Sequence, residues 1–160
     1  MKQSEDRVSE KWQLLSNLYG EYARAAGLTS MSLLVLEIIY DNQDKCTQKL
    51  ICEQSQFTKQ SVNMIIKSFW KQGYVELVEL STDRRNKQVK LSERGMQYAG
   101  KIIGCLWKVD SDVMEKMTDE QRETLIIYAE IYEECIRNAI SRITHIHQKN
   151  ETGGAGADEK

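Results

Sequence analysis

Proline is absent from this 160-residue chain. Because proline interrupts helices and stiffens turns, its absence favours a chain built mostly from helices. Long apolar runs are also missing, and none approaches the ~20 residues that would span a membrane. The polar, acidic start from Met1 to Asp6 is not followed by the apolar core of a signal peptide. We therefore expect a cytoplasmic protein that has no membrane partner.

Clustered metal ligands are lacking as well. The chain has four cysteines, Cys46, Cys52, Cys105 and Cys135, and no C-x-x-C pair. This spacing argues against a zinc ribbon and against a disulfide framework, so reduced thiols are expected. His145 and His147 are one residue apart, so on a helix they point to different sides and cannot share a metal ion. We expect no metal and no cofactor.

Catalytic signatures are absent too. The sequence shows no clustered acid pair, no nucleophile-base pair and no glycine-rich phosphate loop, so an enzyme is poorly supported. Hydrophobic residues make up 41% of the chain, which is enough for a packed interior. The length allows one domain, or two small modules that share a core.

The most informative stretch runs from Ile51 to Gly95. We predict a short helix over about 47–54, a turn at 55–57, and a second helix that Thr58 caps and Gly73 stops. Two β-rich segments follow, at 74–80 and 88–91, with a polar tip at 81–87 between them. Two helices joined by so short a turn form a helix-turn-helix, whose second helix enters the DNA major groove.

The second of these helices has two contrasting faces. Val62, Ile65, Ile66, Phe69 and Trp70 recur at the spacing of a buried helical stripe. The other face carries polar, cationic and thioether groups: Lys59, Gln60, Ser61, Asn63, Met64, Lys67 and Lys71. No acid occurs between residues 58 and 72. Amide, hydroxyl and cationic groups without a carboxylate suit a polyanion, and we interpret the partner as DNA.

Net charge is segregated along the chain. Residues 46–95 hold nine Lys or Arg and five Asp or Glu, a balance of +4, although the whole chain carries −2. Such segregation gives a local positive patch without a basic isoelectric point.

Long helices flank this stretch. We predict helices over 5–26, from the Thr29-Ser30 cap through Asn42, from Ser92 towards Met117, and onward from a capping box of Thr118 and Gln121. The tail from Lys149 is expected to be disordered. The outer helices have apolar faces that the central unit cannot cover, and two copies packed isologously would cover them. We therefore expect a homodimer.

The sequence resembles the MarR family of bacterial winged-helix regulators. The segments 55–63 and 71–76 are similar to the family's recognition helix and the turn into its first wing strand. Asp83-Arg84-Arg85 and residues 89–95 resemble its D-x-R wing and the close of that wing. The resemblance covers roughly residues 5–147. It implies a mainly α (α+β winged helix) fold, with a winged helix-turn-helix lobe at 29–95, dimerisation helices at 1–28 and 96–148, and a tail at 149–160.

The resemblance also implies a function and its residues. It points to a homodimeric transcription factor, usually a repressor, that binds a pseudo-palindromic double-stranded DNA operator. The expected DNA contacts are Thr58, Lys59, Gln60, Ser61, Asn63, Met64, Lys67, Arg84, Arg85 and Lys87. By analogy, Arg85 would enter a narrow minor groove, held by Asp83, while Arg84 and Lys87 would contact the backbone.

The resemblance further implies that a small molecule or an oxidant releases the protein from DNA. Trp12, Tyr19, Tyr22, Met31, Leu34 and Ile38 could line the effector cleft, although such residues at helical spacing are also typical of plain core. A bound effector would shift the dimer towards a form whose recognition helices are wrongly spaced.

Two alternatives stay open. One is a winged-helix module that binds another protein and has little affinity for DNA. The other is a repressor that senses oxidants through a cysteine, for which Cys46 is a candidate because it lies near a helix N-terminus, where the dipole lowers a thiol pKa. Cys105 and Cys135 lie on helical stripes and are expected to be core.

Overall fold

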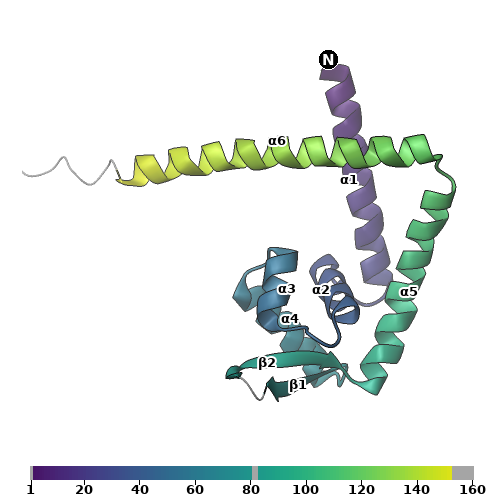
Figure 1. The fold of residues 1–160 in the computed structure, drawn as a ribbon, viewed down its shortest axis with the longest axis vertical. Coiled ribbons are helices and arrows are strands. Elements are labelled where there is room, and N and C mark those ends of the chain that lie inside the picture. Colours follow the sequence, from purple (N-terminus) through teal and green to yellow (C-terminus); the bar gives the residue numbers. More distant parts are fainter. Residues whose placement is uncertain (1, 81–82, 153–160) are drawn as a thin grey trace, which may run out of the picture. The chain divides into compact units, whose positions relative to one another are not determined.

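The computed structural model describes residues 2–80 and 83–152, with side chains described for 6–79 and 87–143. The chain divides into two compact units, Met1–Val109 and Asp110–Lys160. Figure 1 shows the helices and the strand pair in order along the chain. The elements are α1 (Lys2–Ala25), α2 (Ser30–Asp41), α3 (Gln48–Ser55), α4 (Lys59–Lys71), β1 (Val75–Leu80), β2 (Asp83–Leu91), α5 (Glu93–Glu115) and α6 (Asp119–Thr152). The mainly helical winged helix-turn-helix fold expected from the sequence is confirmed.

Threonines cap the N-termini of α2, α3 and α4. The hydroxyl oxygens of Thr29, Thr47 and Thr58 each accept a hydrogen bond from the backbone N–H three residues later, at 3.1–3.2 Å. Each bond satisfies one of the amides that a helix N-terminus leaves unpaired. The caps at Thr29 and Thr58 were predicted from the sequence, and both are confirmed.

Helix α2 lies at the centre of the first unit. Val35, Leu36 and Ile39 are fully buried, and α2 packs against α1, α3, α4 and β2. Its apolar circumference, visible in the sequence, is explained by this central place.

Two tyrosines join α1 to α5. Tyr22 donates to the main-chain oxygen of Ile102 at 2.6 Å, and Tyr98 donates to that of Ala26 at 3.2 Å.

Strands β1 and β2 pair antiparallel as a wing, in register from Val75 opposite Leu91 to Glu79 opposite Lys87. The register shifts between Glu79 and Leu80, so that Leu80 pairs with Asp83. The predicted polar tip at 81–87 is therefore wrong in extent, because β2 already begins at Asp83. Asp83 and Lys87 pair with Leu80 and Glu79 of β1, and such backbone pairing does not depend on side-chain polarity.

Two further boundaries, and the burial of one residue, differ from expectation. Helix α1 begins at Lys2 rather than residue 5, and α6 continues to Thr152. The disordered tail predicted from Lys149 therefore starts inside a helix, and residues 153–160 lie outside the described part of the chain. Trp70 was expected in the buried stripe of α4, but it is 55% exposed. It lies at the edge of that stripe, one residue before the last of the helix.

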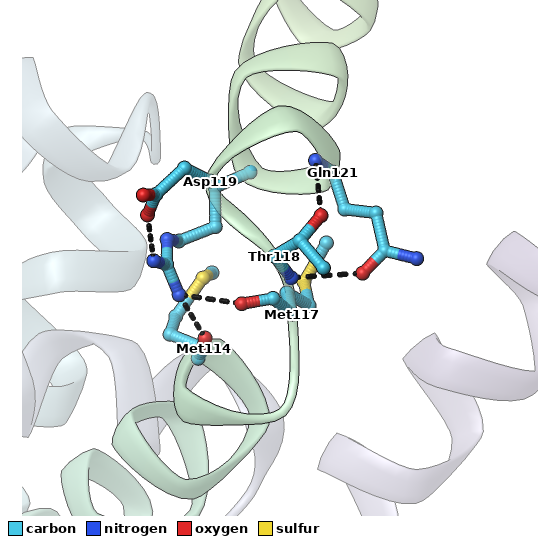
Figure 2. A network of polar contacts seen from close by, with 6 residues as sticks. Met114, Met117, Thr118, Asp119 and Gln121 are labelled. Carbon is cyan, nitrogen blue, oxygen red and sulfur yellow. Dashed lines mark hydrogen bonds and ion pairs between the residues drawn. The ribbon is translucent and has the colours of Figure 1, made fainter.

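The second unit contains the end of α5, a turn and α6. The backbone amide of Thr118 donates to Oε1 of Gln121 at 2.9 Å, and the amide of Gln121 donates back to the Thr118 hydroxyl at 3.2 Å. This reciprocal pair is the capping box predicted from the sequence. Figure 2 shows this capping box near Met114, Met117 and Asp119. The Arg122 guanidinium donates to the main-chain oxygens of Met114 and Met117.

Within the described residues, no single helix is long and apolar enough to cross a membrane. The pair Asp6–Ala25 and Ser30–Asp41, bent by 78°, meets the length and composition requirement only jointly.

Candidate nucleic-acid interface

The face that α4 presents is set by its buried side. Val62, Ile66 and Phe69 are at most 4% exposed, and they hold the helix on the core. The remaining circumference must then face away from the core, because helical residues three and four apart share one side. Thr58 precedes the helix, and its hydroxyl lies 2.9 Å from that of Ser61.

The turn between α3 and α4 is fixed by side chains as well as by its length. Ser55 is buried, and its hydroxyl donates to the Ile51 carbonyl at 2.6 Å while accepting from the Phe57 amide at 3.2 Å. Gln56 has φ +58°, a left-handed conformation that ends α3. Glycine or asparagine usually adopts such a conformation. At Gln56 it must therefore be held by the contacts of the neighbouring residues.

A groove of about 550 Å³ runs between α3, α4 and the wing. Its apolar walls come from Ile66, Leu77 and Val89, and its polar lining includes Lys49, Lys59, Asn63 and Lys87 from separate elements. The nine lining residues are Gln48, Lys49, Cys52, Lys59, Asn63, Ile66, Leu77, Lys87 and Val89. Cations of the helix-turn-helix and of the wing are thus brought to one surface.

Two of these lysines are held by acids. Lys49 lies 3.6 Å from Glu53 on α3, and Lys87 lies 3.9 Å from Glu79 across the wing. All four side chains are at least half exposed. Exposed pairs at these distances contribute little, so a phosphate can replace either carboxylate at small cost. The wing acid that faces Lys87 is therefore compatible with an anionic ligand.

The structure shows where most of the predicted contact residues lie. Thr58, Lys59, Gln60, Asn63, Met64 and Lys67 are exposed, and Ser61 is half-buried. Lys87 is exposed on β2. The backbones of Arg84 and Arg85 belong to β2, but the side chains of both residues lie outside the described part of the structure. Their roles remain predictions.

The predicted effector residues divide into three groups. Ile38 is 6% exposed and belongs to the core. Tyr22 is half-buried, with its hydroxyl bonded to α5, and burial raises its pKa above the usual value. Trp12, Tyr19, Met31 and Leu34 are exposed on α1 and α2. A ligand cleft formed by these residues remains a prediction.

Cys46 is not the reactive thiol that its position in the sequence suggested. It is fully buried, and burial raises the pKa of its thiol to about 12. A thiolate is the reactive form, so this cysteine is protected rather than activated. Cys105 and Cys135, which were expected in the core, are exposed in the chain. An apolar stripe in the sequence does not distinguish a buried face from one left uncovered by its own chain.

Several residues of this surface were not predicted from the sequence. Gln48 and Lys49 on α3, and Leu77 and Val89 on the wing, also line the groove. Lys49 was counted only as part of the positive balance, and Gln48 carries no signal in sequence that would single it out. Only the packing of α3 against α4 and β2 brings them beside the recognition helix.

Comparison with known proteins found a family and a relative with similar sequences. The model of the MarR family matches residues 26–86, which include α2, α3, α4 and β1. The HTH-type transcriptional regulator PapX of Escherichia coli is 28% identical over 97 residues, which cover 60% of this chain. The match spans 57% of the length of PapX.

Solved structures share the fold over most of the chain. A MarR family regulator of Neisseria meningitidis, NMB1585, superposes with a TM-score of 0.71 at 23% identity, covering 86% of this chain and 96% of that one. MepR of Staphylococcus aureus, in a complex with DNA, superposes with a TM-score of 0.67 at 16% identity. That match covers 79% of this chain and 96% of the MepR chain.

Proposed function

We propose that this chain is a member of the MarR family of winged-helix transcriptional regulators and that it acts as a homodimeric repressor of transcription. In this proposal it binds a pseudo-palindromic operator in double-stranded DNA and leaves it when a small molecule binds. The family consists of transcription regulators rather than enzymes.

One observation carries the DNA-binding part of the proposal. The exposed side of α4 presents Lys59, Gln60, Asn63 and Lys67 with no acid on the helix, beside a groove that adds Lys49 and Lys87. Asparagine and glutamine can pair bidentately with adenine, and lysine reaches guanine or phosphate. The DNA complex of MepR shows that a protein of similar fold binds DNA, which supports the same partner here.

Exposed apolar side chains support the homodimer. The second unit leaves Leu125, Tyr128, Ile136 and Ile143 between 37% and 54% exposed along one side of α6. Apolar surface on this scale marks an interaction site. A second copy is the natural partner, because two-fold symmetry lets both copies cover the same face and doubles the DNA contacts.

The repressor and effector parts rest on the family alone. Trp12, Tyr19, Met31 and Leu34 give α1 and α2 exposed apolar groups that could contact a small ligand. Such a ligand acts only if it binds better to the dimer with misplaced recognition helices than to the operator-competent one. It would then release DNA by shifting populations.

Selection from a random duplex library tests the proposal. The purified protein should enrich one inverted-repeat sequence, with half-sites about one helical turn, ~34 Å, apart. Affinity for that sequence should fall steeply as salt rises, as expected for phosphate contacts. If the library shows no enrichment, and the protein leaves heparin at low salt, the protein is a winged-helix interaction module instead.

A further inference from the structure

The wing and the recognition helix are both fixed to the segment that connects α2 to α3. The wing contacts this segment through the backbone, since the Val89 amide donates to the Cys46 carbonyl at 2.9 Å and Thr47 forms a β-bridge with Gln88. It is also fixed through a side chain. Gln88 is 7% exposed, and its amide nitrogen donates to the Gln43 carbonyl at 3.2 Å.

The recognition helix is attached to the first residue of α3, directly after this segment. Gln48, the first residue of α3, donates from its side-chain amide to the carbonyl of Lys59 at 3.0 Å. Lys59 is the first residue of α4, so the bond holds the end of the helix that carries Gln60 and Asn63. Gln48 itself is half-buried and lines the groove between helix and wing.

We infer that Gln48 and Gln88 are positioning residues for DNA recognition, which together fix the separation between α4 and the wing. Gln48 on α3 donates to the main-chain carbonyl of Lys59 on α4, and Gln88 on the wing donates to that of Gln43 in the connection between α2 and α3. A main-chain carbonyl cannot move without the chain around it, so these bonds link whole elements. The inference rests on the proposed DNA-binding function.

The separation matters because the two elements are proposed to contact different grooves. α4 would read base edges in the major groove, while the wing would follow the neighbouring minor groove. Both contacts form together only when the protein holds the spacing that the duplex presents. If the spacing is held in advance, DNA binding does not bear the cost of ordering the wing.

Footprinting of the selected operator separates the two contacts. Methylation of guanine N7 reports on the major groove, and hydroxyl-radical cleavage of sugars reports on the minor groove. Gln88→Met removes the amide donor and retains similar volume. We expect it to lose minor-groove protection at the wing, to keep major-groove protection, and to bind operator about tenfold more weakly, the equivalent of one hydrogen bond.

Gln48→Met is the complementary variant, at a half-buried site where folding is less at risk. It should reduce protection in the major groove and relax base preference across the whole of each half-site. The salt dependence of binding should not change, because no charge is removed. Relaxation at a single base pair would instead identify Gln48 as a direct reader of that base and would overturn the inference.

Gln72→Met is the matched control. The Gln72 side-chain amide also donates to a main-chain carbonyl, that of Ser68 at 3.2 Å, but both residues belong to the C-terminal end of α4. Its removal should leave both footprints intact and change affinity less than about twofold. If Gln88→Met and Gln48→Met behave like this control, the inference fails. If the unaltered protein gives no footprint at low salt, the proposed function fails instead.

Discussion

Two neighbouring side chains on α4 would contact DNA in chemically different ways. Asn63 and Lys67 are four residues apart, so they lie on the same side of the helix, and both are exposed. A neutral amide can distinguish bases by paired hydrogen bonds, whereas an ammonium group mainly displaces counterions from phosphates. The two residues therefore separate sequence recognition from general attraction.

We expect Asn63→Ala to lower the ratio of operator affinity to random-duplex affinity by about tenfold, and to leave the salt slope unchanged. Lys67→Ala should weaken binding to both duplexes equally and reduce the salt slope by about one. Fluorescence anisotropy across a salt series measures both quantities. Identical behaviour of the two variants would show that α4 does not read sequence at Asn63.

Cys46 makes stability depend on alkaline pH. Its thiol pKa is raised from 9.0 to about 12 by burial, so the folded protein holds a proton that the unfolded chain releases. The contribution of the protonated Cys46 thiol to stability is complete below pH 9 and is lost as pH rises towards 12. The free energy of unfolding should fall by roughly 1 kcal/mol between pH 9 and 10 from this group alone.

Urea unfolding under reducing conditions, at pH 8, 9 and 10, measures this loss. Cys46→Ala is less stable throughout because it leaves a small cavity, but its pH profile should be flatter by the same roughly 1 kcal/mol. Parallel profiles for the two proteins would mean that Cys46 ionises as readily in the folded state as in the unfolded one.

Single residues also show what the sequence could and could not predict. The threonine caps depend on neighbours three residues away, and Thr29, Thr58 and Thr118 were all predicted correctly. Burial depends on distant contacts. Cys46 looked like an activated thiol at a helix start, but it is enclosed by the core of the first unit. Trp70 looked buried by its spacing, and it is exposed.

At the scale of elements, Arg122 closes the turn between α5 and α6. Its guanidinium donates to the carbonyls of Met114 and Met117 at 2.6 and 2.7 Å, and pairs with the Asp119 carboxylate (Figure 2). The last carbonyls of a helix lack partners within it and carry partial negative charge. A cation at this place therefore both caps α5 and restricts the first turn of α6.

We expect Arg122→Ala to lower the free energy of unfolding by about 1 kcal/mol, a value reduced for partial exposure. Arg137→Ala is the matched control, because Arg137 pairs with Glu133 within α6 and contacts no helix end. Its effect should stay below about 0.5 kcal/mol. Thermal unfolding compares the two, and equal effects would mean that Arg122 acts only as an exposed ion pair.

Helix α5 packs closely against the start of the wing at Gly95. A Cβ atom there would lie 1.8 Å from the Tyr74 carbonyl oxygen, so an alanine cannot fit unless the backbone moves. We expect Gly95→Ala to destabilise the protein by about 3 kcal/mol or more. Gly104→Ala, on the same helix with open space around it, should instead stabilise by about 0.5 kcal/mol. Chemical denaturation measures both, and a tolerated Gly95→Ala would contradict this packing.

The sequence predicted the kind and order of the elements better than their extents. Gly27 and Gly73 were expected to end helices, and each has a φ above +70°. Strand β2 was expected only from Gln88, but it starts at Asp83. Its charged residues have no apolar alternation, so the strand is set by pairing with β1, and a pattern of side chains does not record such pairing.

At the scale of the whole molecule, self-association decides whether one or two copies of the proposed DNA-binding surface can contact an operator. The side of α6 that carries Leu125, Ile136 and Ile143 is exposed in a single chain. Among the described residues, the buried hydrophobic ones all come from residues 23–106, so α6 contributes none of them. In the proposed dimer, a symmetric partner covers these apolar side chains of α6.

Ile136 tests this contact directly. It is 43% exposed in the chain and lies on the side of α6 that also carries Leu125 and Ile143. Ile136→Lys would bury a charge in the proposed dimer, and we expect at least about a 100-fold rise in the dimer dissociation constant. Operator binding should weaken at least in parallel.

Glu134→Gln is the control. It changes the net charge by the same amount on the opposite side of the helix, and should leave both dimer formation and operator binding unchanged. Sedimentation equilibrium gives the mass of each protein. A monomeric unaltered protein, or an Ile136→Lys variant with an unchanged dimer constant, would show that this side of α6 does not join the two copies.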